Sequence, residues 1–157
     1  MCLVNLNATV LLCNKILDDE SLIGVFDRIT PDVVGTKPTI SFAMLVSLSA
    51  MLPKIGSTMS GDVKYIERDA FYDVKVRIEY AQTGNGFDID NFSFSTHQFN
   101  RINNERDVYE LKRFIHLNDF EYVYGCGEYA VKVLVKKNPS DANEKWVVQT
   151  VHKFTIN

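Results

Sequence analysis

The sequence has few cysteines, and they are widely spaced. The three are Cys2, Cys13 and Cys126, an odd number whose spacing fits neither a disulfide framework nor a zinc site. Isolated cysteines usually behave as small buried apolar residues. The composition therefore argues against a disulfide-stapled secreted fold and favours a reducing compartment, for which we expect the cytoplasm.

Long apolar runs are also absent. No stretch approaches the ~20 uninterrupted apolar residues that a membrane-spanning helix needs. The opening residues MCLVNLNATVLLC are apolar, but no basic residue precedes them, and Leu12 is too large for the position before a processed cysteine. We therefore expect neither a secretion signal nor a membrane partner.

The chain lacks a strong excess of either charge. Its 17 basic and 20 acidic residues give a formal net charge of −3. Nucleic-acid-binding proteins collect Lys and Arg on one face, so this balance predicts no nucleic-acid partner. A chain of 157 residues fits one domain, residues 1–157, and can bury a core without metals or disulfides.

What the sequence does contain is a repeated alternation of apolar and polar residues. In FYDVKVRIEY, residues 71–80, apolar side chains occupy every second position and charged ones lie between them. Successive side chains of a strand point to opposite faces, so this segment is predicted to be a half-buried strand. Residues 129–136 and 146–156 are also strand-like, and the turn formers at 138–144 predict that the two form a hairpin.

Other segments predict further short strands and the turns between them. We expect an opening hairpin around the acidic turn 18–20, a strand at 39–52, an inserted loop or hairpin near 53–69, a turn at 83–86, an alternating strand within 87–99, and a short strand ending near Leu117. The predicted fold class is therefore all-β: an antiparallel β-sandwich with an immunoglobulin-like two-sheet architecture of seven to nine strands.

Motifs in three places resemble a family of small uncharacterised bacterial proteins. LLCNKILDDESLIGVFDRI, residues 11–29, is similar to that family's "LLCD"-like and "GVFDRI"-like strands, and residues 127–129 are similar to its "GEY" turn into a valine-rich strand. Asn14 stands where the family has an aspartate, and residues 50–70 look like an insertion. The resemblance implies a β-sandwich domain and supplies no active site.

Residues able to carry chemistry are present, but not in a recognised pattern. His97, His116 and His152 fall in three separate predicted strands, and Asp88 and Asp90 lack the rest of a calcium loop. No nucleophile elbow or phosphate-binding loop occurs. We expect no catalytic residue, no metal and no cofactor, and hence a protein that is not an enzyme.

Two pairs of residues are singled out as structural candidates. Asp27 and Arg28 interrupt the apolar run of LIGVFDRITPD, and Gly125 and Gly127 flank Cys126. Along one continuous strand Asp27 and Arg28 would leave opposite faces, which excludes a joint role. We expect Asp27 to be partly buried and to hold the turn toward Pro31, and the glycines to form a turn or bulge.

Two functions follow from the predicted sandwich. Its open sheet edges can accept a strand from a partner, so we expect a protein-binding or scaffolding domain that recognises another protein or itself. The alternative is a carbohydrate or small-ligand binding module, because residues 87–99 are rich in phenylalanine and exposed rings stack on ligands. At strand spacing, however, such rings more often belong to the core.

Overall fold

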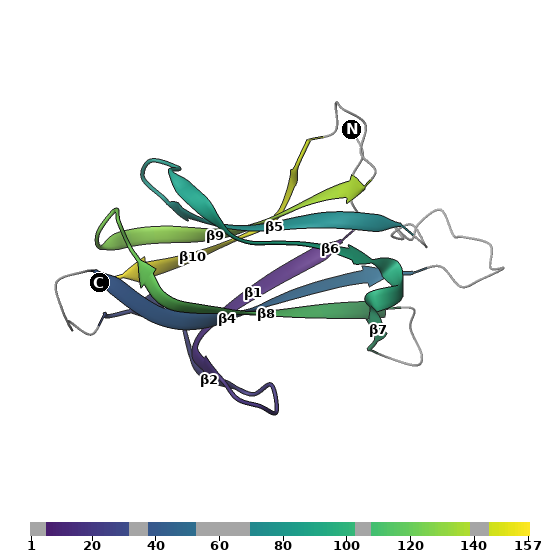
Figure 1. The fold of residues 1–157 in the computed structure, drawn as a ribbon, viewed down its shortest axis with the longest axis horizontal. Coiled ribbons are helices and arrows are strands. Elements are labelled where there is room, and N and C mark those ends of the chain that lie inside the picture. The colour runs from purple at the N-terminus through teal and green to yellow at the C-terminus, as the bar shows by residue number, and fades with distance from the viewer. Residues whose placement is uncertain (1–5, 32–37, 53–69, 103–107, 139–144) are drawn as a thin grey trace.

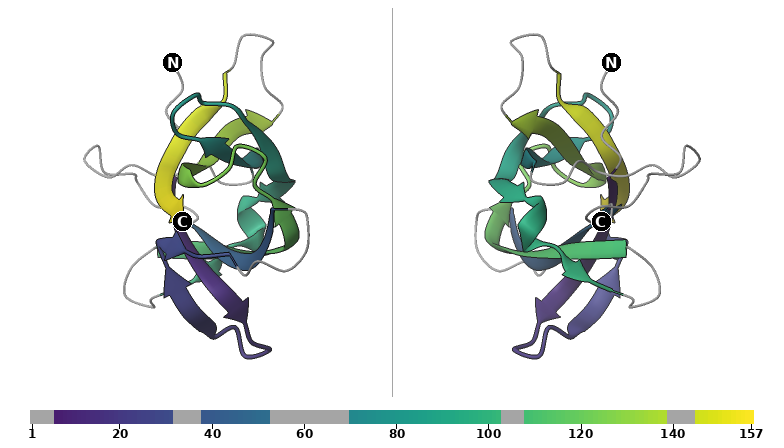
Figure 2. Two further views of the ribbon diagram at one scale, coloured as in Figure 1. Left: turned by 90° about the vertical axis from the view of Figure 1, so that its left-hand side faces the viewer. Right: turned by 90° about the vertical axis from the view of Figure 1, so that its right-hand side faces the viewer.

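The protein is built from two five-stranded sheets that face each other (Figures 1 and 2). The computed structural model describes residues 6–31, 38–52, 70–102, 108–138 and 145–157. The insertion expected near 53–69 and nearly all of the loop expected at 138–144 lie outside these described residues. The predicted all-β sandwich is confirmed.

Each sheet combines strands that are far apart in the sequence. Sheet A contains, in spatial order, β2 (Leu22–Phe26), β1 (Asn7–Ile16), β4 (Thr39–Met51), β8 (Val108–Glu121) and β7 (Asn100–Arg101). Sheet B contains β3 (Arg28–Ile29), β10 (Val147–Ile156), β9 (Gly127–Asn138), β5 (Phe71–Tyr80) and β6 (Gly86–Ser95). A short 3-10 helix, η1 (Thr96–Gln98), connects β6 to β7. The described residues thus form ten strands rather than seven to nine, and two of them span only two residues.

The core lies between the sheets, where the alternating residues of the long strands meet. On β5 the side chains of Tyr72, Val74, Val76 and Ile78 are buried, as the alternation predicts. Phe42 of β4 has three aromatic neighbours with ring centroids 5.9 Å away, and these are Phe26, Phe120 and Phe154. Phe154 lies on β10 and the others on sheet A or beside it, so this cluster ties the two sheets together.

The strand order supports the immunoglobulin-like prediction. Without β2, sheet A reads β1-β4-β8-β7, which is the order of strands A, B, E and D in an immunoglobulin domain. Sheet B likewise places β10, β9, β5 and β6 where strands G, F, C and C′ lie. Tyr129, near the start of β9, donates its hydroxyl to the Gly125 carbonyl at 2.6 Å, as in the tyrosine corner of such folds. Strand β2 is therefore an addition to a known arrangement.

Three details differ from the sequence-based predictions. Strand β8 continues to Glu121, beyond the expected end near Leu117. Its pairing with β4 shifts register between Ile40 and Phe42, and a positive φ of 54° at Asp119 accommodates this shift, so the pairing continues beyond it. His97 lies in η1 and not in a strand. Residues 22–29 do not form one strand, because β2 pairs in sheet A and β3 pairs parallel to β10 in sheet B.

Candidate interaction surface

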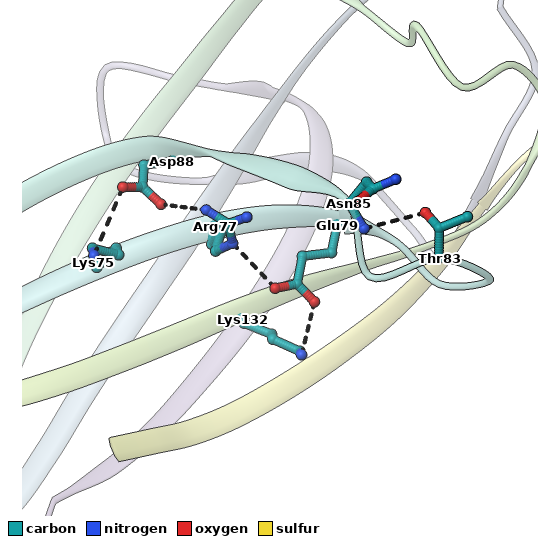
Figure 3. A network of polar contacts seen from close by, with 7 residues as sticks. All are labelled: Lys75, Arg77, Glu79, Thr83, Asn85, Asp88 and Lys132. Carbon is teal, nitrogen blue, oxygen red and sulfur yellow. Dashed lines mark hydrogen bonds and ion pairs between the residues drawn. The ribbon is translucent and has the colours of Figure 1, made fainter. Parts of the chain in front are cut away.

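The outer face of sheet B carries a network of charged side chains across β6, β5 and β9 (Figure 3). Asp88 accepts a hydrogen bond from Arg77 at 3.1 Å and lies 3.9 Å from Lys75. Glu79 lies 3.1 Å from Arg77 and 2.7 Å from Lys132. Each carboxylate thus has cationic neighbours on its own or an adjacent strand, as in a structural cross-strand ladder.

The protonation of Glu79 agrees with this structural role. Partial burial acts to raise the pKa of its carboxyl, but hydrogen bonds from Lys132 and Arg77 outweigh burial and lower the pKa. A carboxylate held ionised between two cations is poorly suited to act as a general base near neutral pH. The contacts of Glu79 therefore hold β5 and β9 together.

Asp88 and Asp90 do not form the cation site that their spacing could suggest. A bulge at Ile89 places both aspartates opposite successive residues of β5, so they leave different faces of β6. Asp90 instead forms a bidentate pair with Arg113 of β8, at 2.8 and 3.3 Å. The described residues contain no group of three or more His, Cys, Asp or Glu side chains that could hold a metal ion.

The glycines around Cys126 form the expected turn. The amide of Gly125 donates to the carbonyl of Tyr122 at 2.9 Å, and Gly125 and Gly127 have φ values of 81° and 140°. A Cβ at Gly127 would lie 3.1 Å from the ring of Tyr80, so the position also requires a small residue. Cys126 is exposed at the tip. The glycines therefore shape the corner that the Tyr129 hydroxyl closes.

The phenylalanines of residues 87–99 do not form an exposed coplanar platform. Phe94 and Phe99 are buried and Phe92 is half-buried, while Phe87 is exposed and tilted by 31° against Phe120. Most of these rings therefore belong to the core, as their strand spacing suggested. Ligand binding by this stretch stays a prediction that the ring geometry does not support.

Asp27 and Arg28 lie where the chain crosses from sheet A to sheet B. The backbone carbonyl of Asp27 accepts a hydrogen bond from Thr155 at 2.8 Å, and Arg28 donates to Asn157 at 3.3 Å. The side chain of Asp27 is exposed, so the expectation that it is partly buried was wrong. The crossing is held by the backbone of Asp27, which a sequence pattern does not reveal.

The hairpin of β1 and β2 combines a buried inner face with an exposed apolar outer face. On the inner face, Leu12 is fully buried and Phe26 packs edge-on against Phe42. On the outer face, Ile23 and Val25 of β2 are 48% and 57% exposed. Outer faces of antiparallel sandwiches are normally polar, so exposed β-branched residues here need another explanation.

The exposed apolar surface continues across sheet A. Strand register places Leu11 beside Leu45, and Leu45 beside Phe114 of β8. One row further along, Cys13 pairs with Val25 on one side and Ala43 on the other. We call the outward-facing set the sheet A patch: Leu11, Ile23, Val25, Leu45 and Phe114.

Two residues beneath the sheet A patch show how it is built. Cys13 and Ala43 are almost fully buried, yet neither belongs to the cluster of buried side chains between the sheets. Their burial therefore comes from larger neighbours on the outer face. Burial raises the pKa of the Cys13 thiol, although a backbone hydrogen bond involving Lys15 opposes this. The thiol is thus a packing group and not a reactive one.

Strand β2 lies at an edge of sheet A among the described strands. Among the described strands, the other edges are β7 and β3, of two residues each, and β6, which carries a bulge and two aspartates. Bulges and charges are devices that discourage strand addition. Strand β2 has the sequence LIGVF, with no charge, and lies at the margin of the fold on the side away from sheet B (Figures 1 and 2).

Charged residues lie beyond both ends of β2. The acidic residues 18–20 form the turn before it, closed by hydrogen bonds of 2.9 Å between Leu17 and Ser21 and between Glu20 and Leu17. A hydrogen bond from Ser21 lowers the pKa of Asp19, which keeps the turn anionic. Asp27 and Arg28 follow at the other end, and both are exposed. The edge is therefore apolar in its middle and charged at both ends.

Sequence reasoning proposed a sheet edge but did not identify which one. The alternation of LIGVF was visible, yet the pattern cannot tell whether Ile23 and Val25 face a second sheet or solvent. A usable signal lay in TVLLCNKI, residues 9–16. In a strand the neighbours Leu11 and Leu12 point to opposite faces, so both faces of this segment are apolar. That signal indicates a strand covered on both sides.

Comparisons with known proteins do not assign the chain to a family. No protein-family model, curated protein or solved structure matches it. Within the described residues, no helix has the length and apolar character needed to cross a membrane.

Proposed function

We propose that this domain binds a protein partner by strand addition at β2. The observation that carries the proposal is an exposed, uncharged edge strand next to the sheet A patch. An incoming strand would pair with the free backbone groups of β2, and its side chains would cover Ile23 and Val25. Backbone pairing supplies affinity in this mode, and the neighbouring side chains supply specificity.

The rest of the molecule supports this choice of surface. In the network on the outer face of sheet B the charges pair with one another, and Asp90 pairs with Arg113 of sheet A. The long edge strand β6 carries a bulge and two aspartates, which discourage strand addition. The hairpin strand β2 is an addition to the immunoglobulin-like strand order, whereas the remaining strands are needed to form the two sheets. The proposed role uses no cofactor and no catalytic residue.

A matched pair of lysine variants tests the proposal. Val25→Lys places a charge in the middle of the edge strand, and Val148→Lys places the same charge on an exposed valine of β10. The immobilised chain and both variants are incubated with a lysate of the cells that produce the protein, and retained proteins are quantified by mass spectrometry. We expect the wild type and Val148→Lys to retain the same proteins from the lysate in similar amounts. Val25→Lys should retain about tenfold less of those proteins.

Folding of each variant is checked by circular dichroism and thermal melting before the capture. Both valines are about half exposed, so neither lysine is forced into the core. Equal retention by Val25→Lys and the wild type would contradict binding at β2. Loss of retention with both lysines would show that added charge acts non-specifically, which also counts against the proposal.

A further inference from the structure

We propose that the outer face of sheet B binds a small ligand through its phosphate group, which lies between Lys75 and Lys136 beside Trp146. The site belongs to the sheet opposite the β2 edge and does not depend on strand addition there. The observation that carries the proposal is a contrast among the outward-facing cations of β5, β9 and β10. Three of them pair closely with carboxylates, whereas the other two share one indole ring.

The closely paired cations of this face are Arg77, Lys132 and Lys153. Each has a carboxylate oxygen within 3.3 Å. Lys75 differs from them, because its only ion pair is with Asp88 at 3.9 Å (Figure 3). The other oxygen of Asp88 lies 3.1 Å from Arg77, which offsets the same carboxylate more closely. The charge of Lys75 is therefore only weakly balanced.

Lys136 has no ion pair among the residues that the structure describes. Asp73 lies opposite it in the register of β5 and β9. The Oδ1 atom of Asp73, however, accepts a 2.6 Å hydrogen bond from Ser93 on the far side, in β6. The charge of Lys136 is therefore also balanced less closely than those of the paired cations.

Trp146 keeps these two ammonium groups close together. The Nζ atoms of Lys75 and Lys136 lie 4.4 and 5.1 Å from the centroid of its ring, so they are within about 10 Å of each other. A cation–π contact attracts an ammonium group without neutralising it, and N–H donors remain for oxygen acceptors. Two positive charges are thus held in place on a small area of the face.

A phosphate monoester matches this arrangement in charge and in number of acceptors. It carries about 1.5 to 2 negative charges at pH 7 and three acceptor oxygens, so one group can accept hydrogen bonds from both lysines. A carboxylate carries a single charge and would balance only one of them. Val148 lies in the same cross-strand row as Lys75 and is 47% exposed, which offers apolar surface to the rest of the ligand.

Trp146 is the only tryptophan of the chain, so its fluorescence reports on this site alone. The purified full chain is titrated with phenyl phosphate at pH 8 and constant ionic strength, and with benzoate as a monoanion of similar shape. We expect a saturable change in emission with phenyl phosphate, a dissociation constant of about 1 mM, and about tenfold weaker binding of benzoate. The indole N–H signal of Trp146 in nitrogen–proton NMR spectra follows the same titrations.

Three glutamine variants test which lysines bind the phosphate group. Lys75→Gln and Lys136→Gln should each weaken binding of phenyl phosphate about fivefold, because one of the two ammonium groups is lost. Lys153→Gln is the matched control and should leave binding unchanged. It removes the same charge from the same face, but from a side chain that is 69% exposed and pairs with Glu128. Circular dichroism confirms the fold of each variant.

The possible outcomes separate the parts of the proposal. The absence of a saturable change in both the fluorescence and the NMR signal would overturn the site. Equal binding of benzoate and phenyl phosphate would overturn the phosphate group as its ligand. An equal loss of affinity with Lys153→Gln would show that only the general charge of the face matters, which also overturns the site.

Discussion

Replacing Tyr129 with phenylalanine removes one hydroxyl from the corner between β8 and β9 and leaves the ring in place. Tyr129 is 1% exposed, and its hydroxyl donates to the Gly125 carbonyl at 2.6 Å. The ring contacts with Tyr80 and Phe154, at 5.3 and 5.7 Å between centroids, do not need the hydroxyl. The substitution therefore isolates a single hydrogen bond and the carbonyl it satisfies.

We expect Tyr129→Phe to lower the free energy of unfolding by about 1–2 kcal/mol at neutral pH. A typical net hydrogen bond contributes about 1 kcal/mol, and a carbonyl left without its partner adds a penalty of similar size. For a domain of this size, such a loss lowers the melting temperature by about 3–6 °C. Urea denaturation followed by circular dichroism measures the change.

The pH dependence of this difference is a second, independent prediction. Burial raises the pKa of Tyr129 to about 12, with smaller contributions from Tyr80, Cys126 and neighbouring tyrosines. Above about pH 10 the unfolded chain releases this proton, while the folded chain keeps it until about pH 12. The contribution of Tyr129 to stability is thus fully present below pH 10 and is lost as the pH rises toward 12.

Phenylalanine has no proton to release, so the gap in stability between the wild type and Tyr129→Phe should shrink between pH 9 and pH 11.5. Tyr109→Phe is the control, because Tyr109 is half-buried on β8 and its hydroxyl makes no hydrogen bond within the described residues. Equal stability of Tyr129→Phe and the wild type at pH 7 would refute the role of the corner. A gap that does not change with pH would refute the raised pKa.

Three further substitutions test other parts of the fold. Gly24→Ala should lose about 1 kcal/mol more stability than Gly84→Ala. Both glycines have a φ near +70°, but only at Gly24 would the added Cβ overlap the Asn14 side-chain amide. Equal denaturation midpoints of the two variants would contradict this. Glu79→Gln should cost about 1 kcal/mol at pH 7. Because the folded-state pKa of Glu79 is lowered, its contribution is fully present above the unfolded-state pKa of about 4.3 and is lost as the pH falls through the lower folded-state pKa; urea titrations at pH 7 and at a series of acidic pH values measure the loss. Asp27→Ala should change stability by less than about 0.5 kcal/mol, since its side chain is exposed and its backbone makes the contact with Thr155; a clear fall in melting temperature would restore the structural role first expected of its carboxylate.

The strands that were predictable are those with a local pattern. Residues 71–80 alternate so regularly that the predicted strand and the observed strand β5 have the same bounds. The opening hairpin and the turn at 83–86 were also recognisable, because turn formers act within a few residues. Residues 108–124 were harder, since β8 passes through a bulge that pairing with β4 tolerates.

The candidate surface was only partly predictable. A sheet edge was expected to bind a partner, and the apolar segment LIGVF, residues 22–26, is present in the sequence. Which strand forms the edge depends on the neighbours it acquires. Both β2 and β4 are apolar, but β2 lies at the edge of sheet A and β4 lies in its middle.

By itself the sequence determined that this chain forms half-buried strands and turns, because side-chain periodicity and turn chemistry are local properties. Tertiary structure alone decided that residues 22–29 divide between two sheets, and that a bulge at Ile89 sends Asp88 and Asp90 to different faces. It also decided that Ile23 and Val25 face solvent and not the core. These outcomes depend on contacts between residues far apart in the chain, which compete for the same apolar surface and are settled only when the two sheets pack.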